Sequence, residues 1–449
     1  MKQVDVVVVG GSAAGPVAVM TAKRHYPEKS VLEIRKEKPG RVMVPCGVPY
    51  IFGTVGSTGK NVIPDSVITS NGGELMIDEV TEIDRAAKTV TTAGGEKISY
   101  GKLILATGSD PVSPPIPGKE LENVFFVRKD ADYIDGMLKK LADAKDIVVI
   151  GGGFIGVEMA DEIQKMGGKN VTIVEMLPHC LQLALDEDQC IEAEKKLAER
   201  GIKVLTEATA KNIAGQGKVS AVELGNGKSL KADAVIIGIG AVPNTELAKK
   251  AGLAIGAMRG IQVDEYMRTV TDQNIFAAGD CAEKFSFFTK KPSGLRLASI
   301  AAIEAHIAGA NLFQLKRKNV GAIGVFATII GDDCFSVAGL TEKAAKEAGY
   351  DIVTGESAAP DKHPGTMPGS KQEKIKLVVD KKTGKVLGGE MLGGRTSAEV
   401  ANIMSAFISN GMTADQVAVF QMGTQPALTA SPIVYQIVNA AELALTKMK

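Results

Sequence analysis

The sequence predicts an α/β fold in which a strand–glycine turn–helix–strand unit occurs twice, followed by a C-terminal α+β domain. The first unit begins with an apolar, mostly β-branched run at residues 4–9 and a glycine-rich turn at 10–15. The second repeats this order at residues 146–150 and 151–156. Continuous apolar runs are typical of buried parallel strands, and a repeated unit indicates two similar domains. From about residue 324, strand-like and helical segments mix, which is typical of an α+β domain.

The remaining elements follow from apolar periodicity and from glycine or proline punctuation. In the first unit we expect a helix to residue 25, a loop at 54–61, and strands at 30–34, 75–83, 88–92, 96–100 and 102–105. The proline-rich residues 111–118 are typical of a linker. In the second unit we expect a helix at 157–165, strands at 171–174 and 234–237, and a meander at 208–230. Later we expect a strand at 274–278 and a helix at 295–313. The C-terminal domain is expected to hold strands at 324–330, 334–338, 374–379 and 386–392, and helices at 342–348, 398–410 and 431–447.

The composition is that of an ordinary globular protein. The 449 residues are too many for one core, so two to four domains are expected. Basic and acidic residues number 52 each, which argues against a surface for nucleic acid. We expect no cleavable signal, and no apolar run is long enough to span a membrane. Five cysteines without zinc-ligand spacing indicate no metal site and a reducing compartment, so we expect a cytoplasmic protein.

The second glycine turn is the stronger nucleotide motif. Gly151, Gly153 and Gly156 follow a strand and open a helix, and Glu175 stands at the end of the next strand. The first glycine makes the turn, the second lets backbone amides reach a pyrophosphate, and the third lets helix and strand pack closely. Glu175 can accept hydrogen bonds from a ribose and would repel a 2′-phosphate, and Met176 follows it. We therefore expect NADH rather than NADPH.

The first glycine turn is less regular. Gly10 and Gly15 fit the pattern, but Ser12 stands at the middle position. The position spaced like Glu175 falls near Arg35, two residues after Glu33. Because side chains alternate along a strand, these two are expected to share a face, and either could meet the ribose or the pyrophosphate.

Cys46 differs from Cys180, Cys190, Cys281 and Cys334 in its setting. Pro45 and Gly47 flank it, and Pro49 follows, so a turn is expected to deliver it to the start of a helix. Backbone amides and the helix dipole would lower the pKa of a thiol there. The alternative is a small buried apolar residue, the commonest role of a cysteine outside disulfides.

With two dinucleotide motifs and one distinctive cysteine, the chain resembles the flavin-dependent pyridine nucleotide-disulphide oxidoreductases. It is most similar to their single-cysteine branch, which comprises coenzyme A disulfide reductases, NADH-dependent persulfide or polysulfide reductases, NADH oxidases and NADH peroxidases. The resemblance covers essentially the whole chain. Besides the two glycine turns and Glu158, it rests on Cys46–Tyr50, Ala106–Gly108, Gly240–Asn244, Thr271 and Ala278–Asp280.

The resemblance implies an FAD domain in two pieces (1–115 and 247–322), an inserted NAD domain (116–246) and a C-terminal dimerisation domain (323–449) of a homodimer. Asp280 would hydrogen-bond the ribityl chain of FAD, and Phe154 would gate access of the nicotinamide to the flavin. The implied FAD-binding residues are Gly10, Ser12, Ala13, Ala14, Gly15, Glu33, Arg35, Pro45, Cys46, Val80, Ala106, Thr107, Gly108, Gly279, Asp280 and Ala298. The implied NAD-binding residues are Gly151, Gly153, Phe154, Ile155, Gly156, Glu158, Glu175 and Gly240.

Several positions depart from relatives in this family. Ile51 replaces the second cysteine of the two-cysteine branch, so no internal dithiol is expected. Ala13 aligns with the histidine of the peroxidases and oxidases, and residues 42–45 lack the usual Ser-Phe-x-Asn of coenzyme A disulfide reductases. Lys23 and Arg24 could hold the phosphates of a substrate like coenzyme A. His363 and Tyr435 could enter the site from the dimerisation domain, or could be ordinary structural residues.

These observations predict an FAD-dependent oxidoreductase that uses NADH to reduce a disulfide, persulfide or polysulfide through Cys46. Coenzyme A is a possible carrier of the substrate sulfur. The alternative is an NADH oxidase that passes electrons to oxygen or a quinone. A third, non-enzymatic interpretation is a flavin-binding redox sensor that signals through oxidation of Cys46.

Overall fold

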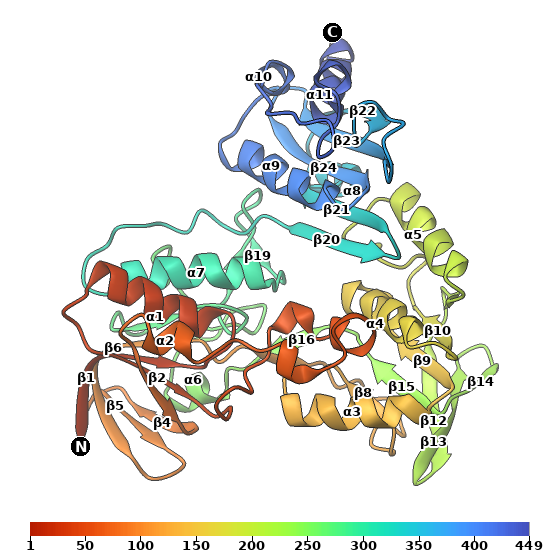
Figure 1. Cartoon of the computed structure of the whole chain (residues 1–449). Coiled ribbons are helices and arrows are strands. Elements are labelled where there is room, and N and C mark those ends of the chain that lie inside the picture. Colours follow the sequence, from red (N-terminus) through yellow and green to blue (C-terminus); the bar gives the residue numbers. More distant parts are fainter. Residues whose placement is uncertain (449) are drawn as a thin grey trace. The chain divides into compact units, whose positions relative to one another are not determined.

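The computed structural model describes residues 1–448, and the chain forms two compact units (Figure 1). One unit comprises Met1–Pro115, Phe125–Ala144 and Ile239–Ala322, and the other holds the remaining residues. The domain boundaries expected from the sequence remain a prediction, because these units group residues by packing and not by the cofactor they hold. No helix within residues 1–448 combines the length and apolar character needed to cross a membrane.

The first unit is built on a seven-stranded sheet in the order β3-β2-β1-β6-β5-β4, with β17 also beside β6. β4 and β5 form an antiparallel extension, and the other pairs are parallel. β6 belongs to both the antiparallel and the parallel parts of the sheet, because its start pairs with β5 and its end pairs with β17. The strands are β1 (Lys2–Val9), β2 (Val31–Arg35), β3 (Glu74–Ile77), β4 (Val80–Asp84), β5 (Thr89–Thr92), β6 (Lys97–Leu105) and β17 (Ile275–Ala277).

Helices α1 (Ala14–His25) and α7 (Ala298–Ala310) pack closely against each other in this unit. Gly309 permits the close approach, because a β-carbon there would lie 2.9 Å from the Ala18 carbonyl oxygen. The other helices are η1 (Pro45–Gly47), η2 (Ile51–Val55), η3 (Thr58–Lys60), α2 (Ser66–Thr69), α3 (Ala131–Asp143) and α6 (Glu246–Lys250). Two small ribbons pair β7 (Ser109–Pro111) with β16 (Ala241–Pro243) and β18 (Lys284–Phe285) with β19 (Pro292–Ser293).

The second unit contains the second strand–turn–helix–strand element. Its parallel strands run in the order β11-β10-β9-β15, and the meander β12-β13-β14 is antiparallel. The strands are β9 (Asp146–Ile150), β10 (Asn170–Val174), β11 (Lys203–Leu205), β12 (Ala210–Gln216), β13 (Lys218–Leu224), β14 (Ser229–Lys231) and β15 (Ala234–Ile237). The helices are α4 (Phe154–Lys165) and α5 (Glu187–Glu199), and β8 (Val124–Phe126) lies where the chain passes from one unit to the other.

The C-terminal part of the second unit is a five-stranded antiparallel sheet in the order β20-β21-β24-β23-β22. α9 packs on β20, β21 and β24, and α11 packs on β22 and β23. The strands are β20 (Val325–Ile330), β21 (Asp333–Gly339), β22 (Ile352–Pro360), β23 (Gln372–Asp380) and β24 (Val386–Gly393). The helices are α8 (Glu342–Glu347), α9 (Ser397–Ser409), α10 (Ala414–Ala418), η4 (Pro432–Val434) and α11 (Gln436–Thr446).

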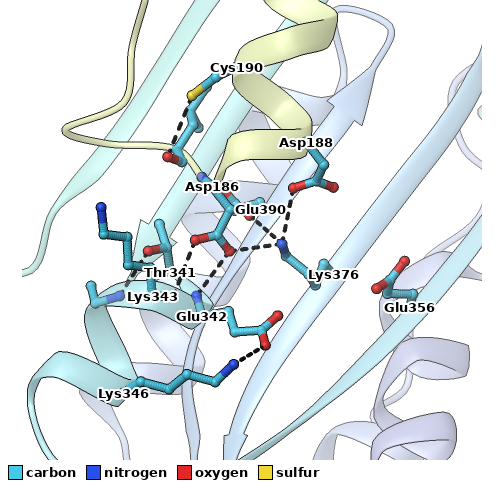
Figure 2. Close-up of polar contacts among 12 residues, drawn as sticks. Asp186, Asp188, Cys190, Thr341, Glu342, Lys343, Lys346, Glu356, Lys376 and Glu390 are labelled. Atoms are coloured by element: carbon cyan, nitrogen blue, oxygen red, sulfur yellow. Dashed lines mark hydrogen bonds and ion pairs between the residues drawn. The ribbon is translucent and has the colours of Figure 1, made fainter. Parts of the chain in front are cut away.

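A buried ionic cluster joins the two parts of the second unit (Figure 2). The Lys376 ammonium lies 2.8 Å from the Asp186 carboxylate, 3.0 Å from Glu390 and 3.3 Å from Asp188. The Asp186 carboxylate also accepts the backbone N–H groups of Glu342 and Lys343 at the start of α8. Strands β23 and β24 and helix α8 are thereby tied to the segment that leads into α5.

The predicted fold class is confirmed, and the differences are local. Residues 75–83 form two strands, not one, because the chain turns at Asp78, whose N–H donates to the Arg35 carbonyl oxygen and whose carboxylate accepts two backbone N–H groups. Residues 97–105 form one strand, β6, where two were expected. The expected loop at 54–61 contains the end of η2 and all of η3, and strand β22 was not predicted.

Candidate functional site

The glycine turn after β1 is the first part of the candidate dinucleotide site. Gly10 has a φ of 111°, and a β-carbon there would clash with the carbonyl oxygen of Ala106. A β-carbon on Gly15 would likewise clash with the Gly10 carbonyl oxygen. Only glycine therefore allows β1, α1 and the end of β6 to approach this closely. The Ser12 hydroxyl is buried without a hydrogen-bond partner in the protein, which is unusual unless a ligand supplies one.

Glu33 faces this turn from the neighbouring strand. A β-carbon on Gly11 would lie 2.9 Å from its Oε1, and one on Gly15 would lie 3.3 Å from its Oε2. The side chain is fully buried, and neither carboxylate oxygen has a hydrogen-bond partner. Burial raises the pKa of Glu33 to about 8, although the Arg35 guanidinium, 3.6 Å away, opposes this. Arg35 itself donates to Asp65 at 2.5 Å, so Glu33 is the residue with acceptors to spare.

These orphaned acceptors fit the adenosine end of FAD. The ribose hydroxyls are donors that would satisfy the Glu33 carboxylate, and the Ser12 hydroxyl would meet the pyrophosphate beside the turn. Of the two alternatives that the sequence left open for Glu33 and Arg35, the free acceptors favour Glu33 at the ribose.

The Glu33→Gln variant should therefore retain FAD less well. Hydrogen bonds to a charged group contribute about 1.5–3 kcal/mol, which corresponds to roughly 10- to 100-fold weaker binding. Since ribose donors favour the ionised carboxylate, the affinity of the wild-type protein for FAD should also rise as the pH increases from 6 to 8. This range leads up to the pKa of Glu33 in the protein without FAD. The variant should lack this pH dependence. Reconstitution of apoprotein followed by flavin fluorescence measures both effects, and Glu74→Gln, an exposed acid on neighbouring β3, is the control.

The turn at Gly279 and Asp280 is held by two ion pairs, of which Lys284–Glu304 is buried and Lys129–Asp280 is partly exposed. The Asp280 carboxylate accepts a hydrogen bond from the Ser109 hydroxyl at 2.6 Å and lies 3.2 Å from the Lys129 ammonium. Burial raises the pKa of Asp280, but Lys129 and Ser109 outweigh burial and hold it below its usual value. A few residues away, the Lys284 ammonium donates to the Gly279 carbonyl oxygen and to Glu304, which in turn accepts the Gly279 N–H. An ionised, fixed Asp280 is suited to accept hydroxyl donors.

Three predicted FAD segments meet beside this turn. A β-carbon on Gly279 would lie 3.1 Å from the Ala14 side chain and 3.4 Å from that of Ala301, one turn after Ala298 in α7. Thr107 and Gly108 are joined to Asn244 by three hydrogen bonds of 2.7–3.1 Å. The contacts of Ala13, Ala106 and Val80 with FAD remain predictions, and Val80 lies just after the Asp78 turn beside Arg35.

Cys46 lies on a tight turn and is the exposed cysteine of the chain. The turn is the short helix η1, in which the Gly47 N–H donates to the Val44 carbonyl oxygen. Asn61 braces it, because its side-chain amide donates to the Val44 carbonyl oxygen at 3.0 Å, and a β-carbon on Gly47 would clash with its Oδ1. The expected helix start is therefore a 3₁₀ turn followed by the five-residue η2, in which Ile51 is fully buried.

The other four cysteines differ from Cys46 in their burial. Cys180, Cys190, Cys281 and Cys334 are all buried, and burial raises the pKa of each thiol. A thiolate is the reactive form, so these thiols are unsuited to nucleophilic chemistry. Cys46 is thus the candidate nucleophile, as the sequence predicted.

The second glycine turn has the geometry of a dinucleotide site. Gly151 has a φ of 109°, and a β-carbon on Gly156 would clash with its carbonyl oxygen. Gly153 caps the start of α4. Glu175 accepts N–H hydrogen bonds from Gly152 at 2.5 Å and Leu177 at 2.7 Å. A carboxylate has about four acceptor sites, so acceptors remain for the ribose of NADH.

The exposed start of α4 contacts β20 in the same unit. The Phe154 ring stacks on Phe326, with centroids 5.2 Å apart and planes 9° apart. One turn further, Glu158 accepts a hydrogen bond from the Thr328 hydroxyl at 3.0 Å, and burial raises the pKa of Glu158 to about 7. Neither Phe326 nor Thr328 was predicted from the sequence. Ile155 is partly exposed beside them, whereas Gly240 belongs to the first unit, and their NAD contacts remain predictions.

The four candidate substrate residues have different settings. Lys23 directs its ammonium to the carbonyl oxygens of Pro27 and Lys29. Arg24 instead lines a cleft of about 600 Å³ in the first unit, which is lined by Thr21, Arg24, His25, Ile303, His306, Ile307, Arg317 and Lys318. In the second unit, the His363 ring hydrogen-bonds the Thr429 carbonyl oxygen, and Tyr435 lines an apolar cleft of about 460 Å³. The two histidines of the basic cleft were not predicted.

Two glycine turns of the kind that binds dinucleotides, together with an exposed thiol, define a flavin- and nicotinamide-dependent thiol oxidoreductase. Residues 4–305 match the pyridine nucleotide-disulphide oxidoreductase family, and residues 325–432 match the dimerisation domain of that family. The chain belongs to this family. It is therefore an oxidoreductase that works with FAD and a nicotinamide dinucleotide.

Several relatives match over nearly their whole length. The chain is 33% identical to an NADH oxidase of Methanocaldococcus jannaschii over 98% of this chain and 99% of that protein. It is also 33% identical to an NAD(P)H coenzyme A polysulfide/persulfide reductase of Pyrococcus horikoshii, over 90% and 91% of the two chains. The solved structure of an NAD-dependent persulfide reductase from A. fulgidus superposes with a TM-score of 0.89 at 32% identity, covering 99% of this chain and 83% of that one.

Proposed function

We propose that this protein uses NADH to reduce a disulfide or persulfide of coenzyme A, with Cys46 as its nucleophile. The observation that carries the proposal is a single exposed cysteine on a braced turn, with the buried Ile51 where a second redox cysteine would stand. Since the chain has no second thiol at that position, the sulfur partner of Cys46 must come from the substrate.

The chemistry follows from thiol–disulfide exchange. The Cys46 thiolate attacks one sulfur of a disulfide RSSR, forms a Cys46–SR bond and releases RS⁻. FAD, when bound, supplies two electrons that it obtains from NADH. With one proton these cleave the Cys46–SR bond, releasing a second thiol and restoring Cys46. The balance is NADH + H⁺ + RSSR → NAD⁺ + 2 RSH, and for a persulfide NADH + H⁺ + RSSH → NAD⁺ + RSH + H₂S.

The basic cleft supports coenzyme A as the group R. It combines Arg24, Arg317 and Lys318 with two histidines, a set of donors suited to phosphates. His306 Nδ1 lies 2.8 Å from the Thr21 hydroxyl, so the ring is oriented before any ligand arrives. The name of the P. horikoshii relative includes coenzyme A, which agrees with this assignment.

The affinity for coenzyme A disulfide should fall as the pH rises. Burial lowers the pKa of both His25 and His306, and neighbouring cations, Lys316 and Arg317 for His25 and Arg317 and Arg24 for His306, lower it further. Phosphates favour the protonated histidine rings, so the binding of coenzyme A disulfide takes up protons. The binding weakens as the pH increases above the pKa of these histidines in the unliganded protein. We expect KM to rise several-fold from pH 6 to 8. His306→Gln should flatten this dependence.

Pantethine, a disulfide with the same reacting arm but without the adenosine phosphates, is the matched control for that measurement. Its KM should show neither the pH dependence nor the effect of His306→Gln. Equal behaviour of the two disulfides would contradict a phosphate-binding role for the cleft.

The proposed function itself is tested by anaerobic NADH oxidation with coenzyme A disulfide or persulfide, with the released thiol or sulfide counted against NADH. We expect the stoichiometries given above. The second candidate is an NADH oxidase, which is favoured by the likeness to the M. jannaschii protein. NADH oxidation with oxygen alone that matches the rate with the best sulfur substrate would favour the oxidase.

We also propose a homodimer and a cytoplasmic setting. The C-terminal part carries an apolar cleft that is lined by Phe407 and Phe420 among other residues. Val419 and Ile433, which are close in sequence to residues of this cleft, are strongly exposed. This part of the chain matches the dimerisation domain of the family. Analytical ultracentrifugation should give twice the mass of the chain. A reducing compartment suits an enzyme whose thiolate must be regenerated.

A further inference from the structure

One carboxylate holds both ends of the segment that carries Cys46. Asp135, in the first two turns of α3, accepts a hydrogen bond from the Arg41 guanidinium at 2.6 Å through Oδ2. Its Oδ1 accepts one from the Thr58 hydroxyl, also at 2.6 Å. Arg41 and Thr58 are themselves 3.4 Å apart, between Nη1 and Oγ1. The side chains of Arg41, Thr58 and Asp135 form a closed ring of contacts. Cys46 lies in the stretch of chain between Arg41 and Thr58.

The ring is built to stay in place. Thr58 is buried, and its only hydroxyl is used here. Burial raises the pKa of Asp135, but Thr58 and Arg41 outweigh burial and lower it, and the hydrogen bond that Arg41 donates to Asp135 raises the pKa of Arg41. Both charges therefore persist across the neutral range. Asn61, three residues after Thr58, then braces the turn itself at Val44 and Gly47.

The segment that precedes α3 also contacts the turn at Asp280, which is expected to hold FAD. Lys129, six residues before Asp135, lies 3.2 Å from the Asp280 carboxylate and 3.1 Å from the Ser109 hydroxyl. A seven-residue stretch thus contacts the turn expected to hold the flavin and the segment that carries the thiol. Fixing both from one short segment limits how far the thiol can move relative to that turn.

We propose that Asp135 is a positioning residue for Cys46: by closing Arg41 and Thr58 on one carboxylate, it keeps the Cys46 turn in the conformation that activates the thiol. The mechanistic consequence rests on the proposed function, in which Cys46 attacks the substrate. A carboxylate in the first turns of α3, about 90 residues after the cysteine, thereby sets the reactivity of that cysteine.

The test compares Asp135→Asn with Asp132→Asn in the FAD-loaded enzyme. Asp132 is a matched control, because it contacts the same guanidinium nitrogen of Arg41 at 2.6 Å but is exposed and does not contact Thr58. The primary readout is the rate at which iodoacetamide alkylates Cys46 between pH 6 and 9, followed by peptide mass spectrometry. In Asp135→Asn the midpoint of this profile should move up towards the value of about 8.5 for an ordinary thiol. The rate at pH 7 should fall about 3- to 10-fold.

Steady-state kinetics should agree with the alkylation data. In Asp135→Asn, kcat for coenzyme A disulfide should fall about tenfold with KM within twofold, whereas NADH-dependent ferricyanide reduction, which bypasses the thiol, should be unchanged. Asp132→Asn should stay within twofold in every assay. Thr58→Val should reproduce the Asp135→Asn profile, and the double variant should add little, as expected for groups acting as one unit.

A wild-type alkylation profile in Asp135→Asn, with FAD content and melting temperature intact, would overturn the proposal. This outcome is distinct from failure of the proposed function. If Cys46→Ser retained full turnover, the proposed function would fail, but the shift in alkylation would still show that Asp135 positions the thiol. Asp135→Glu, which keeps the charge, serves as a further check and should recover part of the wild-type profile.

Discussion

The Cys46→Ser variant should lose coenzyme A disulfide reduction by about 10⁴-fold or more, because a serine hydroxyl is not ionised near neutral pH and cannot form the mixed disulfide. FAD should remain bound, since the acceptors assigned to it, Glu33 and Ser12, lie elsewhere in the first unit. NADH should still bleach the flavin absorbance under anaerobic conditions. The measurement is NADH oxidation at 340 nm with and without the disulfide, on protein matched for flavin content.

The appropriate control is another cysteine. Cys334 is buried on β21 with its pKa raised, so Cys334→Ala should keep activity within about twofold after correction for folded protein. Full disulfide turnover by Cys46→Ser would remove the basis of the proposed function. If oxygen consumption persisted in Cys46→Ser at a wild-type rate while disulfide reduction was lost, oxidase activity would be a side reaction that is independent of the thiol.

The parts of the site that could be predicted from sequence are those fixed by short-range geometry. A glycine turn between a buried strand and a helix constrains a few consecutive residues, so its spacing alone revealed both turns and placed Glu175 at the end of the strand that follows the second turn. For the first turn the spacing pointed near Arg35 and left Glu33 and Arg35 as alternatives. Cys46 was recognisable because prolines and a glycine surround it. The structure confirms that these local patterns encode the fold of both units.

What the sequence could not reveal are the partners that hold these residues. Asn61, Asp135 and Lys129 act on residues 17 to 151 positions away through hydrogen bonds or ion pairs, and no periodicity in the sequence records such contacts. Strand β22 was missed for a related reason. Its sequence, IVTGESAAP, is poor in strand-forming residues, and Gly355 is required because a β-carbon there would clash with the Ala440 carbonyl oxygen in α11. Tertiary packing, not propensity, makes this segment a strand.

The Lys376→Met variant should be strongly destabilised. Lys376 is almost fully buried and is shared by the buried Glu390 and Asp186 carboxylates, and removing one partner of a buried ionic group costs about 3–5 kcal/mol. The matched control is Lys374→Met on the same strand. Lys374 is half-exposed and lies 3.5 Å or more from its two carboxylates, so its loss should cost about 1 kcal/mol or less. Thermal unfolding followed by circular dichroism compares the two variants.

The destabilisation should depend on pH with a definite sign. The pKa of Glu390 is raised to about 7, first by burial and then by the Asp186 carboxylate, although Lys376 opposes the increase. Without Lys376 the pKa of Glu390 in the folded state must increase, and it then lies well above the value of about 4.3 in the unfolded chain. A raised carboxyl pKa gives stability that is present at low pH and is lost as the pH rises through the folded-state value. The cost of Lys376→Met should therefore be smaller at pH 6 than at pH 8.5.

The double variant Lys376→Met/Glu390→Gln separates charge from packing. Glu390 Oε1 accepts a hydrogen bond from the Asp186 N–H at 2.7 Å, and the amide oxygen that replaces it can still accept this bond but brings no charge. If uncompensated charge causes the loss, the double variant should be more stable than Lys376→Met at pH 8.5, and its pH dependence should largely disappear. If the double variant is as unstable as the single one at both pH values, the loss comes from the missing lysine packing. The cluster would then stabilise the contact between α5, α8 and the C-terminal sheet by packing, and not by attraction between its charges.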